Sequence, residues 1–392
     1  MSAEGKGALD GIRVLDLSTG HAAYAGRLLA DLGAEVILVE PPGGALLRRA
    51  APLMGEASLA HEFFNANKKS VTLDLADAAG RAAFGGLVAG ADIVIEALPP
   101  GTLAGWGIGY ETLAARNPRL ILVSISPFGQ SGPRAQERAT DLTLLAAGGL
   151  LSLGGYLDLG PVAVTGGQAE IASGIFGAGS ALVALLQRLV SGAGQWADVS
   201  GQECVAFALE DAIPEWYLNR RIRSRTGDRA REAGTGVYPC RDGYISMVAG
   251  RLGTAKAFKT LTEWCGASEV EGAASLLEPC WQDFDYRQSE EGITRFETIF
   301  GRFCATRGKQ ELYREGQARQ IAIAPVNTIA DVMSDPQLAA NGFFQTMFAP
   351  ALGRALTYPG APYRLSQTPP RLHTAAPAPG QHNAELLGPD RF

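Results

Sequence analysis

The sequence predicts an α/β protein whose large domain is a Rossmann-like parallel sheet with helices on both faces. Short apolar runs at residues 12–17, 35–40, 92–96 and 120–125 alternate with helical segments, as in consecutive βαβ units. From residue 236 the pattern changes to a hairpin followed by helices rich in Trp, Phe and Glu. We therefore expect a second, smaller α+β domain.

The first βαβ unit joins an apolar strand at residues 12–17 to a helix at 22–32 and a strand at 35–40. Ligands of such sheets bind beyond the carboxyl ends of the strands, so the turn after residue 17 is expected to line a site. This turn lacks the G-x-G-x-x-G fingerprint that brings backbone close to a pyrophosphate, which argues against NAD binding.

Further elements continue the alternation. We expect a strand at residues 70–75, a helix at 77–89, a strand at 196–200 and a helix from there to about residue 218. The hairpin has its expected turn at Asp242-Gly243, because Asp-Gly is typical of two-residue hairpin turns. The predicted domains are 1–220 for the first part of the large domain, 225–330 for the small domain, and 335–392 for the return to the large domain.

One acidic residue lies between a glycine-rich loop and a long apolar helix. Gly166 and Gly167 precede Glu170, and residues 171–190 contain no acid and a single base. A helix that is apolar nearly all round is expected to be buried. Glu170 lies near the helix N-terminus, where the dipole favours an anion, so it is either a catalytic carboxylate or a capping residue.

The composition is that of a globular protein, with 46% hydrophobic and 19% charged residues. A net charge of −6 gives no general attraction to nucleic acid. The N-terminus has no secretory apolar segment, and the glycines within residues 171–190 favour a buried helix over a membrane span. The five cysteines are widely spaced and form no CxxC pair, which indicates a reducing, cytoplasmic location and no zinc or other metal site.

A basic run follows the predicted helix that ends near residue 218. Its members are Arg220, Arg221, Arg223, Arg225, Arg229 and Arg231. The run is either a solvated linker or an electrostatic contact for nucleotide phosphates.

Several segments, in order along nearly the whole chain, resemble the family III CoA-transferases, the group of formyl-CoA transferase and carnitine-CoA transferase. The segments are Leu9–Leu17, Leu28–Ile37, Asn65–Ser70, Gly192–Gln195, Asp242–Tyr244 and Asp335–Leu338 with the Pro-rich tail behind it. No single segment is specific, but the ordered set is. The resemblance implies a large Rossmann-like domain built from both ends of the chain, a small inserted domain, and two chains interlocked as a dimer.

The resemblance also assigns residues. The family's catalytic aspartate falls on Glu170, which is a departure from the family, and its mobile glycine loop falls on Gly234-Thr235-Gly236. The expected CoA-binding positions are Gly20, His21, Leu73, Leu75, Ala97, Leu98, Arg138, Thr140 and Asp141. Many relatives carry a base where this chain has Gly105, so one contact to CoA is in doubt. For His21, a hydrogen bond to a backbone carbonyl is the alternative to contacting CoA or acting as a base.

The implied reaction moves CoA between an acyl-CoA and a carboxylic acid. The enzyme carboxylate would form a mixed anhydride and then an enzyme thioester, which divides one difficult exchange into easier steps. CoA thioesters are substrates here, and no tightly bound cofactor is expected.

Two alternatives remain. Acyl-CoA racemases share the fold but pair the carboxylate with a histidine where this chain has Thr140, so the second proton-transfer group is missing. The change to Glu170 leaves open a non-catalytic, CoA-binding subunit that pairs with a homologous active chain. The expected partners are therefore small acyl-CoA and acid molecules and a second chain, either identical or homologous, with no nucleic acid or membrane.

Overall fold

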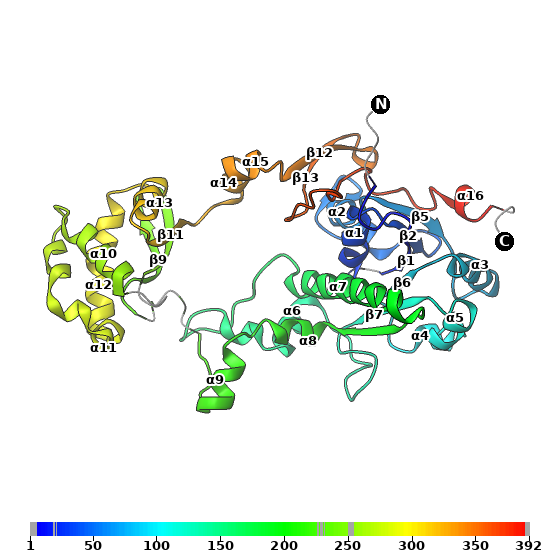
Figure 1. The fold of residues 1–392 in the computed structure, drawn as a ribbon, viewed down its shortest axis with the longest axis horizontal. Helices are drawn as coiled ribbons and strands as arrows, with labels where there is room; N and C mark the ends of the chain where they lie inside the picture. The colour runs from blue at the N-terminus through cyan, green and yellow to red at the C-terminus, as the bar shows by residue number, and fades with distance from the viewer. Residues whose placement is uncertain are drawn as a thin grey trace. The chain divides into compact units, whose positions relative to one another are not determined.

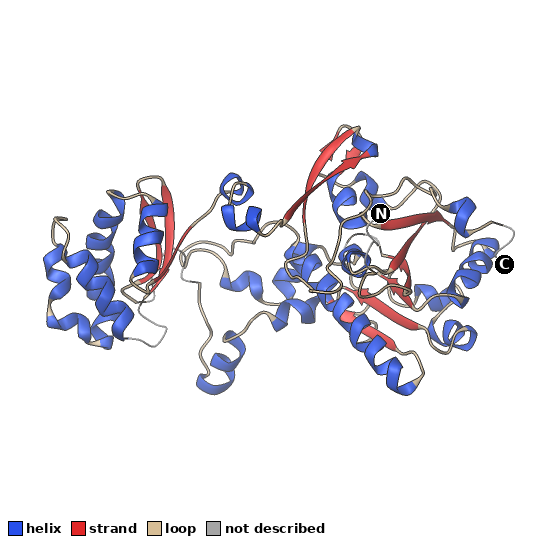
Figure 2. Ribbon diagram, turned by 45° about the horizontal axis from the view of Figure 1, so that its top comes forward, coloured by secondary structure: helices blue, strands red, loops and turns tan. Residues whose placement is uncertain are grey.

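The computed structural model describes residues 6–18, 20, 22–225, 227, 230, 232–249 and 255–388. The chain divides into two compact units (Figures 1 and 2). The first comprises Met1–Ser152, Ala163–Arg223 and Pro336–Phe392, and the second comprises Leu153–Val162 and Ser224–Asp335. Residues 153–162 thus belong to the second unit, although the sequence analysis places them in the large domain.

The first unit is built on a six-stranded sheet in the order β5–β2–β1–β6–β7–β8, with every pair of neighbours parallel. The strands are β1 (Arg13–Leu17), β2 (Glu35–Glu40), β5 (Lys68–Thr72), β6 (Ile93–Glu96), β7 (Ile121–Ser126) and β8 (Trp196–Ser200). The order grows outward in both directions from β1 and β6, as in the doubly wound dinucleotide-binding fold. The predicted α/β class and parallel sheet are therefore confirmed, and the topological switch point lies between β1 and β6.

Helices cover the sheet of the first unit (Figure 2), and alternate strand residues pack toward one helical layer or the other. Val14 and Ile95 face the layer of α1 (Ala23–Asp31) and α7 (Gln168–Ser191). Leu15 and Val94 face the other layer, which holds α3 (Ala78–Ala89) and α5 (Tyr110–Arg116). Because both faces are covered, apolar residues on both sides of the central strands are buried.

Within this chain the long helix α7 is buried on one side and exposed on the other, so the prediction of a buried helix is confirmed for one side only. Its small residues let other backbones approach: a Cβ at Gly174 would lie 2.8 Å from Tyr24 Cβ. On its other side, Val183, Leu186 and Val190 are 67%, 65% and 83% exposed. Among the described residues, α7 alone has the length and apolar composition of a membrane span. Its contacts with α1 and β7, however, make it a core helix of this unit (Figure 1).

The remaining elements of the first unit are short. The predicted helix to residue 218 is divided into α8 (Gly201–Phe207) and α9 (Ala212–Asn219), because Glu210 between them adopts a positive φ of 41°. The C-terminal return contains a hairpin that the sequence analysis did not identify, β12 (Phe344–Ala349) paired with β13 (Arg354–Pro359). The others are β3 (Leu53–Met54), β4 (Ala57–Ser58), α2 (Leu59–Asn65), α4 (Thr102–Gly105), α6 (Asp141–Ala147), α15 (Pro336–Ala340) and α16 (Asn383–Leu386).

The second unit has a three-stranded antiparallel sheet, β11–β10–β9, and a set of helices. Its elements are β9 (Thr235–Cys240), β10 (Gly243–Val248), α10 (Ala255–Gly266), α11 (Phe284–Gln288), α12 (Glu290–Ala305), α13 (Lys309–Ala318), β11 (Ala322–Pro325) and α14 (Ile329–Met333). Cys240 pairs with Gly243, so the hairpin turn is Arg241-Asp242, one residue earlier than predicted.

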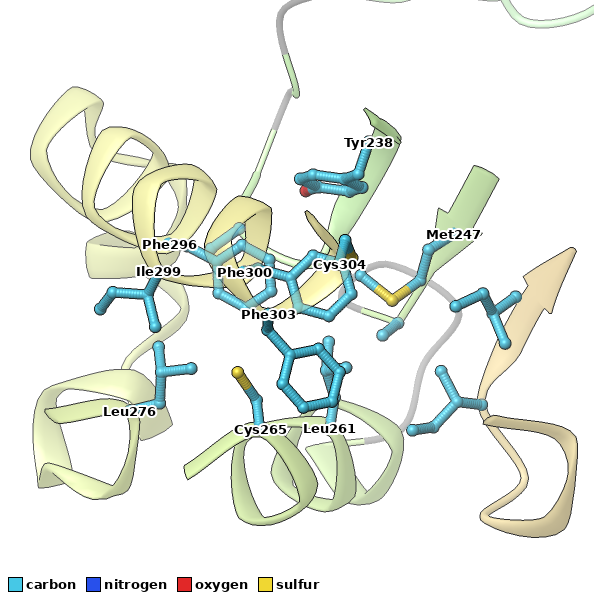
Figure 3. Packing of buried hydrophobic residues seen from close by; sticks show 14 of the residues in the cluster. Tyr238, Met247, Leu261, Cys265, Leu276, Phe296, Ile299, Phe300, Phe303 and Cys304 are labelled. Carbon is cyan, nitrogen blue, oxygen red and sulfur yellow. The ribbon is translucent and has the colours of Figure 1, made fainter. Parts of the chain in front are cut away.

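Aromatic side chains fill the core of the second unit (Figure 3). Phe296, Phe300 and Phe303 lie along one side of α12 and are fully buried. The ring of Phe300 lies 5.2 Å from that of Phe296 and 4.9 Å from that of Tyr238, centroid to centroid. This unit therefore has a hydrophobic core of its own.

Candidate active site

Several of the expected CoA-contacting positions follow the carboxyl ends of parallel strands. Gly20 follows β1, Leu73 and Leu75 follow β5, and Ala97 and Leu98 follow β6. Leu75 is buried in an apolar cluster against which Leu73 and Leu98 pack. These positions therefore lie at the carboxyl ends of the parallel strands, and those after β1 and β6 are next to the switch point. His21 lies outside the described residues.

A buried ion pair that was not predicted from the sequence lies next to the turn after β1. Lys68 Nζ lies 2.7 Å from Asp16 Oδ2, and it also donates to the carbonyl oxygen of Ala23 at 2.9 Å. Asp16 Oδ1 accepts from the backbone N–H of Ser18 at 2.9 Å. Lys68 thus binds Asp16, which precedes the turn, and Ala23, which follows it, next to the switch point.

Beyond β6, a cavity of about 390 Å³ lies between the sheet and helices α4 and α5. The carboxyl of Glu96 borders it, is 4% exposed and accepts from Leu98 N at 2.7 Å. Burial raises the pKa of Glu96, and the nearby charge of Asp198 raises it further. None of the described residues that line the cavity is Lys or Arg, and two of them, Glu96 and Glu111, are acidic.

Glu170 lies in the first turn of α7. Gly166 and Gly167 both have positive φ, 93° and 69°, which explains the glycine pair directly before the helix. Gly167 is the N-cap residue and has no side chain to cap the helix. Asp141 supplies the acceptor instead: its Oδ1 lies 2.8 Å from Ala169 N and 3.2 Å from Glu170 N.

The elements around Glu170 are packed together. Thr140 caps α6 in a reciprocal capping box with Thr143, and Asp141 is the first residue of that helix. Leu144 and Leu145 of α6 pack in one buried cluster with Ala169. The cluster places Asp141 and Glu170 next to each other although 29 residues separate them in the sequence.

The other predicted cationic positions have different surroundings. Arg138 is exposed and precedes Thr140 on the approach to α6. In the basic run, Arg223 pairs with Asp211, and Arg225 donates to the carbonyl oxygens of Tyr156 and Leu159 at 3.1 and 3.0 Å. These two arginines therefore bind protein groups, while Arg229 and Arg231 lie outside the described residues.

The predicted glycine loop belongs to the second unit, and only Gly234 precedes β9, because Thr235 and Gly236 are the first residues of that strand and pair with β10. Gly234 and Gly236 have φ values of 85° and 151°, which favour glycine. The carbonyl of Gly234 accepts from Ala249 N at 2.7 Å. Thr235 Oγ1 donates to Glu232 Oε1 at 3.2 Å. Within the described residues, no group of three or more His, Cys, Asp or Glu side chains is arranged to hold a metal ion.

Residues 9–383 match the family model described as CoA-transferase family III. The chain belongs to CoA-transferase family III. The predicted family is thereby confirmed, and with it an enzyme that transfers CoA between an acyl-CoA and an acid.

Named relatives of this family III chain are similar to it over almost its full length. A subunit of succinyl-CoA:(R)-benzylsuccinate CoA-transferase from Thauera aromatica is 39% identical, with 96% of this chain and 92% of that protein covered. The succinyl-CoA–D-citramalate CoA-transferase of Chloroflexus aurantiacus is 33% identical over 97% and 93%. A crystal structure of a CaiB/BaiF family protein from Brucella suis superimposes with a TM-score of 0.84 at 27% identity, covering 99% and 100%.

Proposed function

We propose that this family III CoA-transferase uses Glu170 as the nucleophile that carries CoA between the two acids. The observation that supports this most directly is the setting of Glu170, at the start of α7 behind two glycines of positive φ. Two backbone N–H groups of this turn already bind Asp141, so capping by Glu170 is not needed to satisfy them.

In the proposed reaction, a Glu170 oxygen attacks the thioester carbonyl of the donor, the C–S bond breaks, and CoA leaves as a thiolate. The thiolate then attacks the Glu170 carbonyl of the mixed anhydride and releases the donor acid as a carboxylate. The acceptor carboxylate attacks the resulting glutamyl-CoA thioester, and the same steps run in reverse. Each step exchanges one acyl bond for another, so no oxidant, metal or net proton transfer is required.

The surrounding residues would bind and shield these intermediates. We assign CoA contacts to the carboxyl edge of the sheet at Gly20, Leu73, Leu75, Ala97 and Leu98. Arg138 and Thr140 remain predicted contacts on the approach to α6. A role for the Gly234-Thr235-Gly236 segment remains a prediction from the family resemblance.

The donor is proposed from the relatives. Both named relatives use succinyl-CoA, so we propose a succinyl-CoA donor and a carboxylic acid acceptor for this chain. A panel of acids supplied with succinyl-CoA, read by mass spectrometry of the new thioesters, tests this proposal. Transfer from other acyl-CoA donors, without any from succinyl-CoA, would contradict it.

The nucleophile is tested by Glu170→Gln. The amide cannot form an anhydride, so this variant should bind CoA but lose transfer and the hydroxylamine-sensitive adduct that forms with donor alone. Glu203→Gln is the matched control, because Glu203 also lies in the first turn of a helix, α8. Transfer by Glu170→Gln at the rate of the unmodified protein would end the proposal.

A second candidate is a CoA-binding subunit that acts with a homologous chain. The 39% identical relative is named as a subunit, and Chloroflexus aurantiacus has α and β subunits of a succinyl-CoA–L-malate CoA-transferase. The same trapping experiment separates the two candidates. A subunit of this kind should bind CoA, form no adduct on Glu170, and support transfer only when a homologous chain is added.

We further propose that the exposed apolar side of α7 is covered by a second chain, because burial of such side chains drives association. Leu186→Glu should lower the apparent mass in sedimentation, whereas Gln187→Glu adds the same charge at a polar position. A monomeric protein at micromolar concentration would contradict this.

A cytoplasmic location is proposed from the cysteines, since all five are free thiols.

A further inference from the structure

The N-terminus of α7 is completed by a residue from another helix. A helix begins with four backbone N–H groups that have no partner within it, and a side chain at the N-cap usually binds one of them. In α7 the N-cap is Gly167, which has no such side chain. A single oxygen, Asp141 Oδ1, accepts from both Ala169 N and Glu170 N.

Asp141 is itself fixed on both of its sides. Behind it, Thr140 and Thr143 form the capping box that begins α6, with Thr143 Oγ1 accepting from Thr140 N at 2.7 Å. Beyond it, buried Leu144 and Leu145 anchor α6 against Ala169, which is 0% exposed. A side chain held in this way can transmit the position of α6 to the first turn of α7.

The charge of Asp141 also matters. The positive end of a helix dipole stabilises an anion and makes it a weaker nucleophile. The Asp141 carboxylate is bound at the positive end of α7. The dipole of α7 therefore acts on two carboxylates, those of Asp141 and Glu170, rather than on Glu170 alone. A second acid 29 residues earlier in the sequence thus takes the role of cap for the turn that carries Glu170.

We propose that Asp141 is a positioning residue for Glu170 rather than a contact for CoA. This inference rests on the proposed role of Glu170 as the nucleophile. By fixing the N–H of Glu170 and of the preceding residue, Asp141 sets where the Glu170 side chain begins. Because a displacement of about 1 Å can cost about 10²-fold in rate, loss of this bond should reduce turnover more than binding.

The test compares Asp141→Ala with Asp141→Asn in steady-state CoA transfer. Asp141→Ala should lower kcat by about 10- to 100-fold while KM for the acyl-CoA changes less than twofold. Asp141→Asn keeps an oxygen acceptor at Oδ1. Its decrease in log kcat should be at most half of the decrease caused by Asp141→Ala. The yield of the hydroxylamine-sensitive adduct on Glu170 should fall in parallel with kcat.

A matched control is Asp283→Ala in the second unit. Asp283 caps α11 by accepting from Asp285 N at 3.0 Å, so the substitution also removes an aspartate cap. It should lower the thermal midpoint without changing kcat. If Asp141→Ala lowers only the thermal midpoint, Asp141 is a structural cap and the proposal is wrong.

Two other results would also overturn the proposal. A raised KM with unchanged kcat would make Asp141 a CoA contact. An Asn variant as impaired as the Ala variant would show that the acceptor oxygen is not what matters. If Asp141→Ala does not fold, Asp141→Asn alone decides: its kcat should lie at most about 10-fold below the unmodified value, with KM changed less than twofold, and a larger loss of kcat would contradict the proposal. Failure of the nucleophile itself is recognised separately, by continued transfer in Glu170→Gln.

Discussion

Lys68 Nζ lies 2.7 Å from Asp16 Oδ2, and both side chains are 0% exposed. The pair joins the first residue of β5 to the fourth residue of β1. Removing one partner of a buried ion pair leaves an uncompensated charge in the interior, which costs about 3–5 kcal/mol. Since Lys68 also binds Asn65 Oδ1 at 3.0 Å, it is the centre of this buried group.

We therefore expect Lys68→Met to lower the free energy of unfolding by about 3–5 kcal/mol in urea titrations. The double variant Lys68→Met with Asp16→Asn should recover part of this loss, because no charge is left unpaired. The matched control is Lys6→Met, whose partner Asp10 lies 3.2 Å away at the surface with side chains 85% and 48% exposed. Lys6→Met should lower the free energy of unfolding by less than about 1 kcal/mol. Equal losses in the two single variants would contradict the role given to burial.

The stability of the first unit should also depend on His61. Burial, together with the nearby charge of Arg48, lowers the pKa of His61 to about 4. The unfolded chain takes up a proton near the usual pKa of about 6.5, while the folded chain stays neutral down to about pH 4. The contribution of neutral His61 to the free energy of unfolding is therefore fully present above pH 6.5. It is lost as the pH falls from 6.5 toward 4.

Between pH 7 and pH 5 this effect should remove about 2 kcal/mol from the free energy of unfolding. His61→Gln has no such titration, so its free energy should fall by that much less over the same interval. Other groups around the site, such as Glu40 and Lys68, are common to both proteins and cancel in the comparison. Parallel pH profiles for the two proteins would show that His61 is protonated alike in both states.

Asn67 holds the C-terminal return against the sheet. It has a positive φ of 65°, which asparagine tolerates better than most residues. Its Oδ1 accepts from the N–H groups of His373 and Thr374 at 2.6 and 3.0 Å, and its Nδ2 donates to Arg371 O at 2.8 Å. One side chain thus binds three residues of the tail.

Asn67→Gly should lower the free energy of unfolding by about 2–4 kcal/mol through these lost bonds, and Asn67→Ala should lower it further by the cost of positive φ. Both variants should be cleaved faster by protease between residues 360 and 380. Asn117→Ala is the control, because Asn117 also donates to two backbone carbonyls, those of Val88 and Ala91. It should destabilise the protein without exposing the tail, and preferential tail cleavage in Asn117→Ala would contradict the assignment.

The sequence predicted the regular parts of the fold because their patterns are local. The apolar runs of β1, β2, β6 and β7 were located within one residue at each end. β5 begins two residues earlier than expected and ends at Thr72, since Lys68 is a buried residue that a hydrophobic pattern does not reveal. The hairpin of β12 and β13 was missed for a related reason, because its alternation is weak and most of it is half-buried or exposed.

The candidate site was only partly predictable. Glu170 could be placed at a helix start from Gly166 and Gly167, whose conformational freedom is a local signal. The bond from Asp141 is a tertiary contact across 29 residues, and nothing in its local sequence distinguishes a cap for α7 from a contact for CoA. The Lys68–Asp16 pair was missed because charged residues are expected at the surface.

The variant Glu170→Asp changes the length of the side chain but keeps its carboxylate chemistry. Aspartate can form the same anhydride and thioester as glutamate, but its carboxylate lies one methylene closer to the backbone. The first turn of α7 is held by Asp141 and by buried Ala169, so it is not free to advance and restore the distance. If the pocket fits the longer side chain, Glu170→Asp should lower kcat by about 10²-fold although the family carries aspartate at this position.

CoA affinity, measured by calorimetry, should change little in Glu170→Asp, because the sheet edge that we expect to bind CoA is untouched. Kinetics and adduct trapping with the same donor then give the decisive comparison. A variant that transfers CoA faster than the unmodified protein would mean that glutamate has weakened an ancestral site, and the CoA-binding subunit would become the better account of this chain. A slower variant that still forms the aspartyl adduct would instead show that the chemistry survives and that only its geometry is adapted to glutamate.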